Sequence, residues 1–183
     1  MHGIISLLDE GHATRIAAMR ASLKDRFSFH GMDVPPFPHV SYHVAEQYEV
    51  ALLEPILRTF AAYTAPFEVE TTGLGIFTTG LQPVLYVNVV RHPRLSALHA
   101  ALWPTLAALS AGIIEYYHPD RWVPHITLHH GNLSYDALAE AVRLLSPRGF
   151  TWRLRMDNLA LLVGDGETPQ HRVQYRFPLT GTR

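Results

Sequence analysis

The sequence contains no cysteine, which excludes disulfide bonds, thiolate nucleophiles and zinc sites built on thiolates. Charged residues are scarce at 17%, and the formal net charge is −1, so the chain lacks the broad positive surface that long duplex nucleic acid requires. No apolar stretch approaches the length of a membrane span, and the opening MHGIIS lacks the basic start and apolar run of a signal peptide. We therefore expect a cytoplasmic protein without a membrane partner.

The chain does have enough apolar residues to fold into a compact structure. Nearly half of its 183 residues are hydrophobic, which is typical of a globular protein with a sizeable core. We expect a single domain over residues 1–183, built from two lobes and monomeric. A local positive pocket would suffice for a short or terminal polyanion, so a small nucleotide or an RNA end remains a candidate partner.

Two segments carry the same pattern, PHVSYH at 38–43 and PHITLH at 124–129. Each places a hydroxyl residue two positions after a histidine, inside a run that predicts a buried strand. Side chains alternate faces along a strand, so His39 and Ser41 are expected to project together, as are His125 and Thr127. The other alternate positions are apolar and fit a core.

These four side chains suit phosphodiester chemistry. Histidine transfers protons near neutral pH because its ordinary pKa is about 6.5. Cleaving a phosphodiester needs a base for the attacking oxygen and an acid for the leaving oxygen, and two histidines can divide these roles. The hydroxyls of Ser41 and Thr127 can hold the charge that builds on the phosphate oxygens. This arrangement requires no metal and no cofactor.

The elements around the motifs repeat in the same order. Strand, helix, strand, helix and strand are expected twice, in residues 1–80 and again in 81–183, which predicts an α/β protein with two similar lobes and the histidine strands facing a cleft between them. The expected strands start or lie at 4–8, 39–44, near 67, 85–90, 125–129, near 150 and 173–177; the expected helices at 16–27, 50–60, 95–109 and 138–145; and the expected loops at 28–38 and 111–124.

Local signals refine these boundaries. Pro93 suits the first turn of its helix, and Ser134 is a candidate N-cap. Pro104 predicts a kink or a break inside the helix at 95–109. The sequence Gly-Asp-Gly at 164–166 indicates a hairpin turn before the last strand.

The paired motifs, PHVSY at 38–42 and PHITL at 124–128, resemble those of the two-histidine (2H) phosphoesterase superfamily, in particular the bacterial 2′-5′ RNA ligase and RNA 2′,3′-cyclic phosphodiesterase group. The resemblance covers essentially the whole chain. It implies a bilobal fold of two antiparallel-containing sheets flanked by helices, with both motifs in a central groove. It also implies catalytic roles for His39 and His125, phosphate-holding roles for Ser41 and Thr127, and metal-independent action on 2′,3′-cyclic or 2′-5′ phosphodiesters.

Further residues are candidates for substrate binding on the same face. Phe37 could stack on a base, although core packing explains it equally well. Tyr86 and Asn88 alternate away from apolar neighbours and are expected to line the groove, as is Ser6. Arg121 could reach the groove mouth as an anion donor, although an arginine just before a strand is usually solvated.

His43 and His129 share the alternation of the catalytic pairs but lie about 13 Å along the strand from His39 and His125. One interpretation makes them partly exposed residues at the strand exits. The other makes them a second pair that binds a transition metal or a distal phosphate of the substrate. The remaining histidines are expected at the surface: His2, His12, His30, His92, His99, His118 and His171, with His130 given no role.

Two other classes of function stay open. A nucleotide-binding or RNA-end-binding module could keep the groove without turnover. A metal-dependent hydrolase could use His43 and His129 together with the motif histidines, although the motif strands offer no carboxylates.

Overall fold

The computed structural model describes residues 1–27, 34–78, 82–131, 133–164 and 171–182. The elements follow in the order β1 (His2–Leu7), α1 (Glu10–Phe27), β2 (His39–Tyr48), α2 (Val50–Tyr63), β3 (Phe67–Phe77), β4 (Val84–Val89), α3 (Pro93–Ala108), β5 (Ser110–Ile113), η1 (Glu115–Tyr117), β6 (His125–His130), α4 (Tyr135–Leu145), η2 (Ser146–Arg148), β7 (Arg153–Met156), β8 (Asn158–Gly164) and β9 (His171–Pro178). Two short elements fall in the segment expected to be a loop at 111–124: η1 lies inside it, and β5 begins one residue before it.

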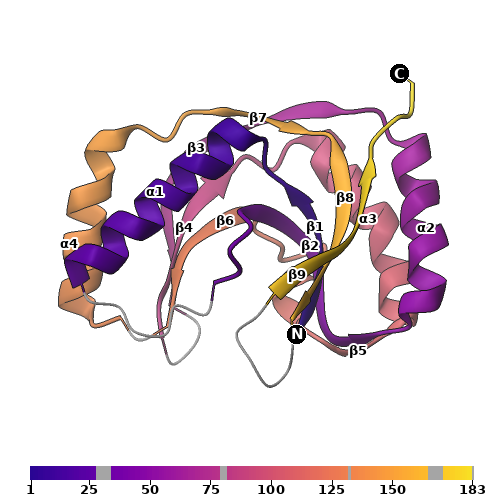
Figure 1. Ribbon diagram of the computed structural model, residues 1–183, viewed down its shortest axis with the longest axis horizontal. Coiled ribbons are helices and arrows are strands. Elements are labelled where there is room, and N and C mark those ends of the chain that lie inside the picture. Colours follow the sequence, from indigo (N-terminus) through magenta and orange to yellow (C-terminus); the bar gives the residue numbers. More distant parts are fainter. Residues whose placement is uncertain (28–33, 79–81, 132, 165–170, 183) are drawn as a thin grey trace.

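The strands form two antiparallel sheets with helices on their outer sides (Figure 1). The five-stranded sheet has the order β5-β2-β1-β8-β9, and the four-stranded sheet has the order β6-β4-β3-β7. Helices α2 and α3 pack against the five-stranded sheet, whereas α1 and α4 lie against the four-stranded one. The mixed fold with two antiparallel sheets is therefore confirmed.

The repeated order of elements is also confirmed, but the lobes do not coincide with the sequence halves expected to form them. Each sheet contains strands from both halves, because β3 joins the four-stranded sheet while β5, β8 and β9 join the five-stranded sheet. The first helix of each half packs against the histidine strand of the other half, α1 against β6 and α3 against β2. This exchange brings the two motif strands, β2 and β6, into contact at the centre.

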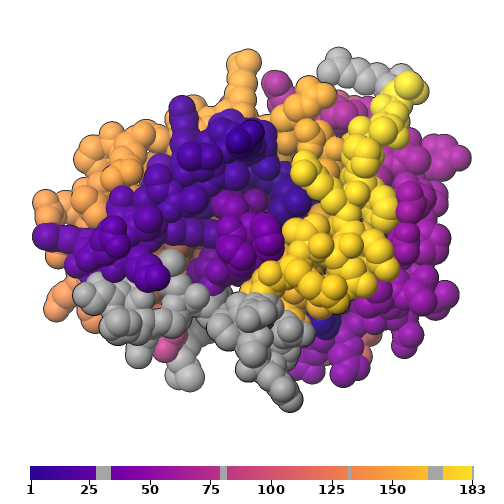
Figure 2. Space-filling view, in the orientation of Figure 1, coloured from indigo at the N-terminus to yellow at the C-terminus, as the bar shows by residue number. Residues whose placement is uncertain are grey.

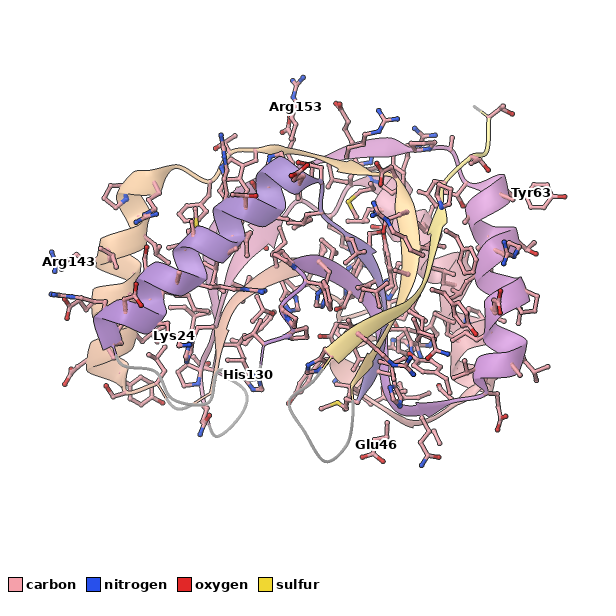
Figure 3. All side chains as sticks on the ribbon, viewed as in Figure 1. Lys24, Glu46, Tyr63, His130, Arg143 and Arg153 are labelled. Carbon is pink, nitrogen blue, oxygen red and sulfur yellow. The ribbon has the colours of Figure 1, made fainter. Side chains whose placement is uncertain are left out.

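Most of the apolar core lies between the sheets and their helices. Each helix contributes buried leucines to one continuous cluster, for example Leu23 of α1 and Leu102 of α3. The opposite faces of α1 and α4 carry charge: Lys24 of α1 is exposed, and Figure 3 shows Arg143 pointing outward from α4. A second, small apolar cluster of Ile5, Ala160 and Leu162 lies on the other face of the five-stranded sheet.

The local sequence signals define the helix ends as expected. Pro93 is the first residue of α3, and the Ser134 hydroxyl caps α4 by accepting the backbone N–H of Ala137 at 3.2 Å. Helix α3 continues through Pro104 and ends one turn later, so the expected break does not occur there. Strands β8 and β9 pair as a hairpin would, although Asp165 and Gly166 of the expected turn lie outside the described residues.

Within the described ranges, we find no helix that is both long enough and apolar enough to cross a membrane.

Candidate active site

The two motif histidines occupy equivalent positions and are held in the same way. His39 begins β2 and His125 begins β6. The Nδ1 atom of each ring lies within hydrogen-bond distance of the carbonyl oxygen two residues earlier, that of Phe37 at 2.5 Å and that of Val123 at 2.8 Å. A carbonyl oxygen only accepts, so Nδ1 carries the proton in both rings. The neutral imidazole therefore keeps the lone pair on Nε2, where it can accept a proton.

The two rings lie close enough to interact electrostatically. A positive charge on His125, Arg20 or His171 lowers the pKa of His39. Tyr117 of η1 connects the two motifs, since its phenol hydrogen-bonds with the side chain of Ser41 and its ring centroid lies 6.3 Å from that of His125. In Figure 2, atoms of the segment that leads into β2 reach the surface between α1 and β9.

Burial keeps both histidines neutral near pH 7. It lowers the pKa of His39 from 6.5 to about 4, partly opposed by the hydrogen bond to Phe37. Burial also lowers the pKa of His125, and its hydrogen bond to Val123 again opposes this effect. An uncharged imidazole with a free Nε2 can act as a base, and one that gains a proton can act as an acid.

Ser41 and Thr127 lie on the same sheet faces as the histidines that precede them. On β2, Leu7 of β1 pairs with His39 and Ile5 pairs with Ser41. On β6, Asn88 pairs with His125 and Tyr86 pairs with Thr127, again two positions apart. We call this surface, with His39, Ser41, His125 and Thr127, the histidine face. The alternation expected from the sequence holds for all four residues.

Both motif strands contain a β-bulge directly after the hydroxyl residue. On β2, Ile5 is opposite Ser41 but Ile4 is opposite His43, so Tyr42 is an additional residue. On β6, Tyr86 is opposite Thr127 but Leu85 is opposite His129, which makes Leu128 the additional residue. One extra residue reverses the faces of every side chain that follows.

The bulges correct the expectation for His43 and His129. Both point to the core face of their sheets, away from the histidine face, and they are 0% and 1% exposed. They are neither partly exposed nor part of the histidine face, because the simple alternation that placed them there is interrupted. The structure therefore does not bring these two histidines together with His39 and His125 as a metal-binding set.

His43 belongs to a buried aromatic cluster between β2 and α3. Its Nδ1 lies 2.6 Å from the Tyr48 hydroxyl, and its ring centroid lies 4.7 Å from that of Trp103. His99 of α3 packs against Trp122 at 3.9 Å and is 1% exposed, so the expectation that it lies at the surface is wrong. Of the other histidines expected at the surface, His30 lies outside the described residues.

These buried histidines predict a loss of stability in acid. Burial lowers the pKa of His43, His99 and His129 from 6.5 to about 4. The unfolded chain therefore binds more protons between about pH 6.5 and pH 4, and the free energy of unfolding should fall through that range as pH decreases. Each unit of difference in pKa between the folded and unfolded chain corresponds to about 1.4 kcal/mol. The combined effect of the three histidines on the free energy of unfolding is therefore comparable in size with the whole stability of a domain.

Urea unfolding at pH 7, 6, 5 and 4.5 measures this effect. The His99→Leu variant should show a shallower dependence on pH than the wild type, because one of the three buried histidines is then absent. Equal stability at pH 7 and pH 4.5 in the wild type would contradict the prediction.

The other candidate residues differ in how close they lie to the histidine face. Tyr86 and Asn88 pair with the motif residues of β6, and the Tyr86 ring lies 5.2 Å from His125. Phe37 is half-buried and packs against the small apolar cluster. The side chain of Arg121 is exposed. Ser6 instead points into the core, where its hydroxyl lies 2.8 Å from that of Tyr42, so it does not line this face.

Three residues near the motifs were not predicted from the sequence. Phe77 stacks on Tyr86 at 4.1 Å and meets His125 edge-on at 4.9 Å. Tyr117 bridges the two motifs, and Arg20 of α1 approaches both of them. Only Arg20 carried a usable signal, because it falls within the apolar stripe of its helix beside Met19, where a charged residue is unusual.

Side-chain donors from elsewhere in the chain fix the backbone just before each bulge. The indole N–H of Trp122 donates to the carbonyl of Ser41 at 3.0 Å. The guanidinium of Arg20 donates to the carbonyl of Thr127 through Nε at 3.2 Å and Nη2 at 2.7 Å. Each hydroxyl residue is therefore held by a group from the opposite half of the sequence.

The described residues offer no grouping of three or more His, Asp or Glu side chains that could hold a metal ion. A surface cavity of about 370 Å³ lies away from the motifs, and no histidine that could act as an acid or a base lines it. Its lining consists of Pro66, Arg155, Asp157, Asn158, Arg176, Pro178 and Leu179.

Comparison with known proteins shows the family of this chain. A sequence model of the 2′-5′ RNA ligase superfamily matches residues 8–168. Solved structures share the fold. TT0787 of Thermus thermophilus has 20% sequence identity and a TM-score of 0.63, and the match covers 100% of this chain and 99% of that one. E. coli LigT complexed with ATP has 20% identity and a TM-score of 0.62, with 98% and 96% of the two chains covered, and a protein described as a phosphoesterase has 17% identity and a TM-score of 0.59, with 98% and 97% covered. A search of curated proteins gave no match.

Proposed function

The chain belongs to the 2′-5′ RNA ligase superfamily, and from this premise we propose that it is a phosphodiesterase that acts without a metal on the 2′,3′-cyclic or 2′-5′ phosphodiester of a nucleotide or RNA end. The proposed catalytic residues are His39, Ser41, His125 and Thr127. Phe37, Tyr86, Asn88 and Arg121 are proposed to contact the substrate around them.

The observation that carries this proposal is the matched anchoring of the two histidines. Each Nδ1–H is held by a backbone carbonyl, so each ring offers Nε2 to the histidine face. A single ring of this kind would supply only a base or only an acid. Two rings near enough for a charge on His125 to lower the pKa of His39, each beside a hydroxyl, match the need for both roles at one phosphorus.

The proposed reaction uses one molecule of water. One imidazole accepts a proton from water as its oxygen bonds to phosphorus. The other imidazole takes up a proton when the negative charge of the bound phosphodiester lies beside it. As the bond between phosphorus and one ribose oxygen breaks, this imidazole gives that oxygen its proton. A cyclic phosphate thus becomes a phosphate monoester with a free hydroxyl. Ser41 and Thr127 donate hydrogen bonds to the non-bridging oxygens while negative charge builds on them.

The proposed substrate is small, and two facts support this choice. The net charge of −1 provides little attraction for a long polyanion. The structurally similar E. coli LigT was solved in complex with ATP, a single nucleotide. We therefore propose that the histidine face takes one phosphodiester and the nucleoside attached to it.

Incubation with 2′,3′-cyclic nucleotides, with RNA bearing a cyclic end and with 2′-5′ dinucleotides, all in the presence of EDTA, tests the proposal. At least one of these should be hydrolysed at an unchanged rate with and without chelator, and chromatography of the product should show which oxygen retains the phosphate. Binding of nucleotide monophosphates without any hydrolysis would indicate a binding module instead. Loss of activity in EDTA, restored by a divalent metal, would indicate a metal-dependent hydrolase.

A further inference from the structure

Arg20 is a buried arginine whose side chain joins three parts of the structure. It projects from α1 and is only 7% exposed. In addition to its two bonds to the Thr127 carbonyl, its Nη1 donates to the carbonyl of Pro35 at 2.8 Å, in the segment that leads to His39. The guanidinium has five N–H groups, of which these contacts use three. Arg20 therefore holds the backbone next to both motifs and retains donor capacity.

The charge of Arg20 is not neutralised by a described side chain. Every partner of its guanidinium in the described part of the chain is a neutral carbonyl, and none is a carboxylate. Burial lowers the pKa of Arg20 to about 10, which leaves the group charged at neutral pH. A buried charge that lacks a counter-ion is costly, and an anion that binds nearby removes part of that cost.

The positive charge lies close to the histidine face. It is among the groups that lower the pKa of His39, together with His125 and His171. The corresponding hydrogen bond at the other motif, from the indole of Trp122 to the carbonyl of Ser41, comes from an uncharged donor. Both motifs are therefore held by a side-chain hydrogen bond to the backbone, but only the donor at Thr127, which is Arg20, carries a positive charge.

We infer that Arg20 is a positioning residue with a second role, in which its fixed charge offsets that of a phosphate bound between His39 and His125. The inference rests on the proposed function in taking a phosphate ester as the ligand. A residue that only tied α1 to β6 would need no charge, as Trp122 illustrates. The charge should strengthen phosphate binding through space and, in addition to burial, favour the neutral form of His39.

Binding of inorganic phosphate tests the inference without any need for turnover. We would titrate phosphate at pH 7 and constant ionic strength and follow the melting temperature of the wild type, Arg20→Lys, Arg20→Gln and the control Arg26→Gln. Arg26 lies on the same helix but is exposed and paired with Glu140 at 2.6 Å. We expect R20Q to bind phosphate about tenfold more weakly, R20K to remain within about threefold of the wild type, and R26Q to match it.

The pH dependence of turnover is the second readout. Removing the charge should raise the pKa of His39, so the limb of the pH–rate profile that belongs to His39 should move to higher pH by about half a unit or more in R20Q and stay in place in R20K. A merely structural role would lower the melting temperature of both variants and move neither the phosphate affinity nor the limb. If R20Q does not fold, Arg20→Met takes its place.

The outcomes separate this inference from the proposed function. Equal phosphate affinity in the wild type and R20Q, or no phosphate binding by the wild type, overturns the role of Arg20 even if the protein is an active phosphodiesterase. A wild type that binds phosphate through Arg20 but hydrolyses none of the substrates above supports the inference and refutes the proposed function.

Discussion

Alanine in place of either His39 or His125 is expected to lower kcat for the substrate identified above by about 10²–10⁴-fold. Each ring is proposed to move one proton, and in the proposed reaction neither can replace the other because the acid and the base act on opposite sides of the phosphorus. Substrate binding should change much less, since the hydroxyls and Arg20 remain. Steady-state kinetics with the purified variants measures both quantities.

A control from the same strand separates loss of chemistry from loss of structure. His130 ends β6, is exposed and is labelled in Figure 3, and His130→Ala should retain wild-type kcat. The wild-type pH–rate profile should be bell-shaped, and each alanine variant should lose one limb of the bell. The limb lost in His39→Ala should be the limb that moves in R20Q. If both alanine variants keep wild-type kcat, the assignment of the two histidines is wrong.

Much of the fold could be predicted because local patterns carried it. The order of strands and helices followed from hydrophobic periodicity, and the Ser134 cap and Pro93 fixed helix ends by chemistry that acts within one turn. The face shared by His39 and Ser41 followed from simple alternation over three residues. These features depend on interactions between residues that are close in the sequence, and such interactions can be predicted from one sequence.

What could not be predicted depends on contacts between distant segments. The bulges at Tyr42 and Leu128 have no local signature, because tyrosine and leucine fit a regular strand equally well. They become apparent only from the register with β1 and β4. The exchange of α1 and α3 between the sheets is likewise a matter of tertiary packing. As a result, alternation placed His43 and His129 on the wrong face.

Arg20 and His99 are polar residues whose burial has a signal in the sequence. Both residues interrupt the apolar stripe of a helix, Arg20 beside Met19 in α1 and His99 beside Leu98 in α3. A polar residue at such a position must either find partners or remain buried at a cost. The structure gives the two residues different outcomes: Arg20 binds backbone carbonyls near the site, whereas His99 packs among aromatic rings.

Removal of the motif hydroxyls is expected to have the next largest effect. Ser41→Ala and Thr127→Val should each lower kcat by about 10²–10³-fold, the range found when a single donor to a developing oxyanion is lost. Valine keeps the shape of threonine, so the Thr127 variant removes the hydroxyl with little change in packing. The conservative variants Ser41→Thr and Thr127→Ser keep a hydroxyl and should retain most of the activity.

Ser41 has a second contact that this comparison must address, because its side chain also hydrogen-bonds with Tyr117. If Ser41 acted only by holding Tyr117, Tyr117→Phe would lower kcat as much as Ser41→Ala. We expect a smaller effect from Tyr117→Phe, since the Ser41 hydroxyl would remain free to donate to the phosphate. Equal losses in these two variants, together with full activity in Thr127→Val, would show that the hydroxyls support the structure rather than the transition state.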